Sequence, residues 1–126
     1  PLKLTDIETF IVGNPWKNWV LIQLHTDDGI SGVGEATCHR RAKTAETAVL
    51  EMRRYFMGKD PFDVEGINAE MRVVSAPAYV TAAVDMACWD IMGKAAGVRA
   101  YQLLGGRVRE LIKAYANGWV SGRSDV

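Results

Sequence analysis

The sequence predicts an α+β fold, in which a three-stranded antiparallel meander is followed by a helical bundle. Apolar and polar residues alternate through the first third of the chain, which is the period of half-buried strands. From Ala42 onward, apolar residues recur at steps of three and four, which is the period of helices. With 126 residues and 48% hydrophobic content, the chain is long and apolar enough for one domain with a packed core.

Three strands are expected, over residues 3–12, 19–26 and 30–36. Gly13-Asn14-Pro15 interrupts the pattern after the first strand, and Asp27-Asp28-Gly29 is a tight-turn sequence between the second and the third. The third strand contains Gly32 and Gly34, which have no side chain. Glycines in a strand leave room for another element to approach the backbone closely.

Four helical segments are expected after the strands. The first runs from Ala42 to about Phe56, before Gly58 and Pro61. The second begins after Asp63, a good N-cap residue, and continues to about Val74. The third begins after Pro77, covers 78–96 and is closed by Gly97, and a short helical turn over 101–104 ends at two further glycines.

The third helix is apolar on nearly every side over residues 82–91, so it has to be covered all round. A domain of this size normally leaves one face of a helix in water, and we therefore expect this helix to need a partner surface. Asp85 and Asp90 lie within the apolar stretch, and a buried carboxylate requires a partner. Asp90 and Lys94 are four residues apart, which predicts an ion pair.

Composition excludes several classes of function. The 15 basic and 15 acidic residues balance to a net charge of zero, so there is no electrostatic signature of nucleic-acid or anionic-membrane binding. No apolar run approaches the roughly 18 residues that a membrane-spanning helix needs. Cys38 and Cys88 form neither a disulfide framework nor a CxxC zinc motif, which favours the cytoplasm. The acidic residues are scattered, so no magnesium site is predicted.

Two loops carry candidate binding residues. His39, Arg40 and Arg41 precede the first helix, and a helix N-terminus also favours anions, so this loop suits a carboxylate or a hydroxyl-rich ligand. The alternative is a solvated basic loop. Trp16 and Trp19 flank a turn, where they either wall a pocket or pack against the core.

Three stretches together resemble the N-terminal capping domain of the enolase superfamily, in its mandelate racemase/muconate lactonising enzyme branch. They are Thr26-Asp27-Asp28-Gly29-Ile30-Ser31-Gly32-Val33-Gly34-Glu35-Ala36, Ala83-Val84-Asp85-Met86-Ala87-Cys88-Trp89-Asp90-Ile91-Met92-Gly93-Lys94 and Tyr101-Gln102-Leu103-Leu104-Gly105-Gly106. The resemblance implies an enolase N-terminal domain-like fold that covers a (β/α)7β barrel. It assigns residues 1–110 to the capping, substrate-specificity domain. A predicted strand over 111–116 then begins the barrel within residues 111–126. The chain starts at Pro1 without a methionine, and we expect a piece of a longer protein.

The function implied by the resemblance is abstraction of the proton α to a carboxylate, with Mg²⁺ stabilising the enediolate. The ending Ala116-Asn117-Gly118-Trp119 and the loop with Trp16 look most like acid-sugar dehydratases of the gluconate, galactonate or mannonate type. The catalytic residues and the Mg²⁺ ligands are expected on barrel strands, outside this chain. The substrate-binding residues carried over are Trp16, His39, Arg40 and Asn117. The expected partners are an acid sugar, the chain's own barrel and further copies in a homo-oligomer.

Two other interpretations stay open at this point. Racemases, epimerases and cycloisomerases belong to the same branch, and a free-standing cap acting as a binding or oligomerisation module is the non-enzymatic alternative. One departure from the family pattern is the connection over 72–80, which is shorter than expected.

Overall fold

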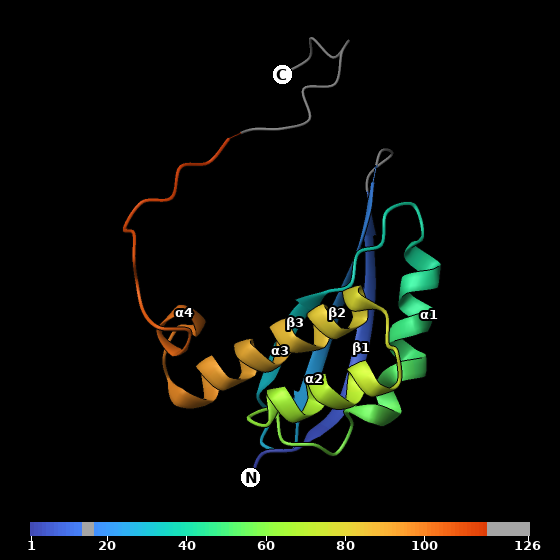
Figure 1. The fold of residues 1–126 in the computed structure, drawn as a ribbon, viewed down its shortest axis with the longest axis horizontal. Coiled ribbons are helices and arrows are strands. Elements are labelled where there is room, and N and C mark those ends of the chain that lie inside the picture. The colour runs from blue at the N-terminus through green and yellow to red at the C-terminus, as the bar shows by residue number, and fades with distance from the viewer. Residues whose placement is uncertain (14–16, 116–126) are drawn as a thin grey trace.

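The computed structural model describes residues 1–13 and 17–115. It contains a three-stranded antiparallel sheet in the order β1-β2-β3, formed by β1 (Leu4–Gly13), β2 (Asn18–Thr26) and β3 (Ser31–Glu35). The predicted meander is confirmed, with strand ends within one or two residues of the expected ones. Figure 1 shows α2 and α3 crossing in front of this sheet, with α1 beside it.

The helices follow the predicted order: α1 (Ala42–Met52), the short 3-10 helix η1 (Arg53–Tyr55), α2 (Val64–Val73), α3 (Ala78–Ala96) and α4 (Ala100–Leu103). The first helix was expected to continue to Phe56, but its last turn tightens into η1. Gly97 ends α3 with a φ of 67°, in the left-handed region that glycine adopts at no steric cost.

The core lies between the sheet and the helices. Val20, Ile22 and Leu24 alternate along β2 and are fully buried, as the period-two pattern predicted. From the helical side, Val49 of α1, Ile67 of α2 and several residues of α3 close the same core. The opposite face of the sheet carries the half-exposed residues Phe10, Val12 and Val33, together with polar side chains.

The backbone of β3 lies directly against α3. A Cβ atom on Gly32 would overlap the carbonyl oxygen of Ala87, and one on Gly34 would overlap the carbonyl oxygen of Ala83. The close approach predicted from the two glycines is confirmed, and the approaching element is α3. The missing side chains therefore set the distance between the helix and the sheet.

The expectation that α3 needs a surface from elsewhere is wrong for most of the helix. Its residues Ala83, Val84, Ala87, Cys88 and Ile91 are fully buried within this chain, because the sheet, α1 and α2 all pack against it. Met86 is the large apolar residue of α3 that stays exposed, at 42%.

The predicted partners of the two aspartates in α3 are present. Asp85 Oδ1 accepts a 2.7 Å hydrogen bond from Asn68 Nδ2 on α2. Asp90 forms the expected ion pair with Lys94, at 2.8 Å between Oδ2 and Nζ. Both pairs are partly exposed, so neither aspartate is an isolated buried charge.

The short connection between α2 and α3 closes as a tight turn. The backbone nitrogen of Ala76 donates to the carbonyl of Met71 at 2.9 Å, and Ser75 adopts a left-handed φ of 54°. Pro77 then precedes the first residue of α3. The few residues available therefore suffice to reverse the chain.

Residues 111–115 do not form the predicted strand. Leu111, Ile112 and Tyr115 are between 83% and 90% exposed, in an extended segment that runs away from α4 (Figure 1). A strand needs a neighbouring strand for its hydrogen bonds, and the described part of the chain places none beside this segment. Within the described ranges, no helix is long and apolar enough to cross a membrane.

Candidate functional site

The His39–Arg40 loop and the strand ends that flank the other candidate loop lie at one end of the sheet. Antiparallel pairing places the end of β1 beside the start of β2, where Gly13 pairs with Asn18. It also places the end of β3 at this end of the sheet, since Glu35 pairs with Leu21. Figure 1 shows the connection from β3 to α1 rising to the same end of the sheet. We call this region the loop end of the domain.

Thr37 joins the segment after β3 to the backbone at the start of β2. The ladder between β2 and β3 continues for one more bond, from the nitrogen of Ala36 to the carbonyl of Val20 at 2.8 Å. The hydroxyl of Thr37 then accepts a 3.1 Å hydrogen bond from the nitrogen of Val20. Sequence patterns did not single out Thr37, because a β-branched residue after a strand looks like a continuation of that strand.

His39 and Arg40 are both exposed at the loop end, immediately before α1. The turn that carries them is closed by a 3.0 Å hydrogen bond from the nitrogen of Arg41 to the carbonyl of Cys38. Arg40 has a φ of 57°, in the left-handed region where a residue with a Cβ is disfavoured. Among the described residues, no side chain caps the start of α1, and its first turn holds no acidic residue.

The start of β2 adds an aromatic ring and a cation to the loop end. Lys17 Nζ lies 5.1 Å from the centre of the half-buried Trp19 ring, a cation–π distance. Trp19 is thus neither fully in the core nor free in solvent. Trp16 and Asn117 fall outside the described residues, so their predicted substrate contacts stay predictions.

Glu46 fixes the beginning of α1 against β1. Its carboxylate accepts a 2.9 Å hydrogen bond from Lys43 Nζ and a 3.0 Å bond from the hydroxyl of Thr9. These two bonds lower the pKa of Glu46 below its usual value, with Lys43 the larger cause. The ionised carboxylate ties the helix that follows the His39–Arg40 turn to the edge of the sheet.

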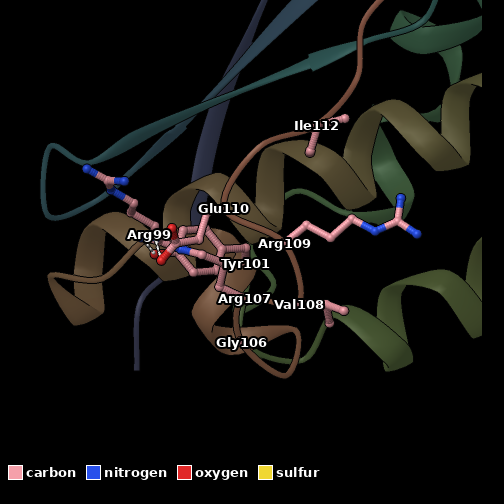
Figure 2. Close-up of a pocket in the computed structure, with 8 residues that line it drawn as sticks. All are labelled: Arg99, Tyr101, Gly106, Arg107, Val108, Arg109, Glu110 and Ile112. Carbon is pink, nitrogen blue, oxygen red and sulfur yellow. Dashed lines mark hydrogen bonds and ion pairs between the residues drawn. The ribbon is translucent and has the colours of Figure 1, made fainter.

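A separate open pocket lies between α4 and the segment after it, far along the chain from the loop end. Arg107 packs 5.8 Å from the centre of the Tyr101 ring and donates a 3.3 Å hydrogen bond to its hydroxyl. Figure 2 shows the side chains of Arg99 and Arg109 extending in opposite directions. Because the guanidinium groups do not converge, the pocket is not organised as an anion site.

The described residues offer no metal centre. They contain no group of three or more His, Cys, Asp and Glu side chains close enough to hold a metal ion. Mg²⁺ prefers several converging oxygen ligands. The residues described in this chain therefore do not fit a magnesium site, and no chemical step can be assigned to a metal here.

Sequence comparison identifies close relatives across almost the whole chain. The D-galactonate dehydratase of Variovorax paradoxus is 39% identical, and that of Pectobacterium atrosepticum is 40% identical. Each alignment covers 96% of this chain and 32% of the relative. The chain therefore spans about a third of the length of the curated relatives it matches.

Solved structures agree with the fold. An enolase from Pantoea ananatis with bound D-gluconate and Mg superposes with a TM-score of 0.78 and 32% identity, over 86% of this chain and 28% of that one. A mandelate racemase/muconate lactonizing enzyme from a Sulfitobacter species gives a TM-score of 0.77 and 30% identity, over 87% and 31% of the two chains. The sequence model of one family matches residues 7–105, from β1 to the end of α4. The chain belongs to the mandelate racemase/muconate lactonizing enzyme family, of which it carries the N-terminal domain.

Proposed function

We propose that this chain is the capping domain of a longer, Mg²⁺-dependent acid-sugar dehydratase of the D-galactonate type. The observation that carries the proposal is the identity of 39–40% with D-galactonate dehydratases over 96% of the chain. The cap occupies residues 1–110, and residues 111–126 begin the barrel. This assignment accounts for the exposed apolar residues over 111–115, which a barrel would cover.

The reaction would remove water from the sugar acid. A base takes the proton from the carbon next to the carboxylate, an acid gives a proton to the neighbouring hydroxyl, which leaves as water, and the resulting enol tautomerises to a 2-keto-3-deoxy acid. The base and the Mg²⁺ ligands would lie on the barrel, outside this chain. The enzyme would act in the cytoplasm, where the two free cysteines stay reduced.

His39 and Arg40 are the residues of the cap that we assign to the substrate, with Trp16 and Asn117 as further candidates. An exposed imidazole and guanidinium lie beside a helix start that no described side chain caps, and all three favour an anion or a hydroxyl-rich molecule. A charged hydrogen bond contributes about 1.5–3 kcal/mol. Enzymes lower barriers by about 8–23 kcal/mol, so the cap supplies specificity rather than the chemical step.

The test is the activity of the full-length protein that contains this chain. Purified protein with Mg²⁺ is incubated with D-galactonate, D-gluconate and D-mannonate, and the 2-keto-3-deoxy product is measured. We expect turnover of D-galactonate that disappears with EDTA, and no turnover by the 126-residue chain alone. Exchange of the α proton with D₂O without loss of water would overturn the dehydratase assignment in favour of a racemase or epimerase.

The substrate role of His39 and Arg40 is tested in the same protein. Replacing either residue with alanine should raise KM at least fivefold with a smaller effect on kcat, because the lost contacts are to the bound sugar acid. Lys3→Ala, at the opposite end of the sheet, is the control and should leave both constants unchanged. Unchanged kinetics in H39A and R40A would leave the loop as a solvated basic turn.

A further inference from the structure

The hydroxyl of Thr37 takes the place of a backbone carbonyl at the end of the β2–β3 ladder. Val20 is fully buried, so its N–H group needs a partner inside the protein. The carbonyl of Val20 is still paired with the backbone of Ala36, but its nitrogen is paired with the side chain of Thr37 instead. Because a side chain completes the ladder, the backbone is free to leave the sheet at this point.

The departing backbone forms the turn that carries the candidate substrate residues. Cys38 is partly buried and packs against the core, and its carbonyl closes the turn by accepting from Arg41. His39 and Arg40 lie between these two residues and are exposed. The hydrogen bond between Val20 and the Thr37 hydroxyl is thus the last one that holds this segment to the sheet before the turn.

On the other side of this bond lies the beginning of β2. Val20 follows Trp19, and Lys17 lies against the Trp19 ring. The Thr37 hydroxyl bond and the backbone bond of Ala36 to Val20 therefore connect the start of β2 with the segment that leads into the turn. Movement of the turn relative to the start of β2 requires these bonds to break or the ends of both strands to move together.

We propose that Thr37 is a positioning residue, whose hydroxyl holds the His39–Arg40 turn in a fixed relation to the start of β2. The turn and the start of β2 then keep one arrangement at the loop end. The inference rests on the proposed function for its kinetic consequence, but not for its structural one. Thr37 acts through His39 and Arg40 and is assigned no contact with the substrate.

Three variants of the full-length protein test this role. Thr37→Val removes the hydroxyl and keeps the β-branched shape, whereas Thr37→Ser keeps the hydroxyl. Thr26→Val is the matched control, because the Thr26 hydroxyl makes a 2.8 Å hydrogen bond to the carbonyl of Ile30 at the opposite end of β2. Thr37→Cys, whose thiol is a weaker hydrogen-bond acceptor than a hydroxyl, replaces T37V if that variant does not fold.

The first measurement is hydrogen–deuterium exchange followed by mass spectrometry. In T37V, we expect peptides containing Val20 and residues 38–45 to exchange at least tenfold faster than in the wild type. T37S should match the wild type within about twofold, and T26V should accelerate exchange only near the β2–β3 turn. Equal exchange at residues 38–45 in T37V and the wild type would overturn the proposal.

The second measurement is the kinetics of D-galactonate dehydration. T37V should raise KM about five- to twentyfold with kcat within about threefold of the wild type, and T37S should restore KM. A T37V variant with faster exchange but an unchanged KM would also overturn the positioning role, because the bond would then be only structural. If the wild type does not dehydrate D-galactonate, the proposed function fails. The hydrogen–deuterium exchange measurement alone then decides whether Thr37 holds the turn.

Discussion

The carboxylate of Asp90 on α3 accepts a 3.0 Å hydrogen bond from the backbone nitrogen of Val33 on β3. The same oxygen pairs with Lys94, whose ammonium group donates a 2.7 Å hydrogen bond to the carbonyl of Ser31. The ion pair therefore occupies one donor and one acceptor on the open edge of β3. An unpaired strand edge is a template for association with other chains, and this pair blocks part of it.

Replacement of Asp90 by alanine should lower the free energy of unfolding by about 1–2 kcal/mol, because the Val33 N–H and Lys94 both lose a charged partner. Urea unfolding of the 126-residue chain measures the change. Lys43→Ala removes the exposed lysine of the Lys43–Glu46 pair and leaves the bond of Glu46 to Thr9 in place, so it serves as the control, with an expected loss below about 0.5 kcal/mol. Equal losses in the two variants would show that the Val33 bond adds nothing.

Gly34→Ala should destabilise the fold by about 3 kcal/mol. The added methyl group would overlap the carbonyl oxygen of Ala83, and a backbone carbonyl cannot move unless α3 shifts away from β3. Gly66→Ala is the control, because the three atoms nearest to its methyl group all belong to the movable side chain of Asp63. Alanine also favours the helix there, so G66A should leave stability unchanged or raise it by up to about 1 kcal/mol. A mild effect of G34A would mean that the contact between β3 and α3 is loose.

Arg40→Gly should raise the free energy of unfolding and weaken substrate binding at the same time. A left-handed backbone costs a residue with a Cβ about 1–2 kcal/mol, and glycine removes this strain. The greater conformational freedom of glycine in the unfolded chain offsets part of that stabilisation. The free energy of unfolding should therefore rise by up to about 1 kcal/mol, while KM for the sugar acid rises at least fivefold. Ser75→Gly relieves the same backbone strain between α2 and α3, away from the loop end, and should raise stability without changing KM. A rise of KM in S75G as large as in R40G would contradict the assignment of Arg40 to the substrate.

The Cys88 thiol should be unreactive in the folded protein. Burial raises the pKa of its thiol to about 12, with a smaller contribution from the charge of Asp85. In a Cys38→Ser variant, alkylation by iodoacetamide at pH 8 should therefore follow unfolding of the chain, since the thiolate is the reactive form.

The same shift gives a pH dependence. The unfolded thiol ionises above a pKa of 9.0 while the folded one remains neutral, so this contribution to stability is present below pH 9 and is lost as the pH rises toward 12. Cys88→Ala should flatten the alkaline fall in the free energy of unfolding. In the alkylation experiment, rapid modification of Cys88 under native conditions would contradict the expected protection of its thiol, because iodoacetamide would then need an open path to α3.

The sequence by itself determined the local elements. Alternation fixed which face of β2 is buried, and the spacing of apolar residues with Pro77 and Gly97 fixed both ends of α3. The pair of glycines in β3 predicted a close approach, and the four-residue spacing predicted the pair of Asp90 and Lys94. These features depend on backbone conformation and short-range periodicity, which a sequence expresses directly.

Tertiary structure alone decided which distant segments meet. Three features depend on how elements far apart in the sequence pack together: the burial of α3 by its own chain, the pair of Asn68 and Asp85, and the bond of Thr37 to Val20. The predicted strand over 111–116 failed within the described residues for the same reason, because a strand exists only beside its partner. Local patterns specify which elements form and which faces they bury, whereas long-range packing decides which side chains share a site.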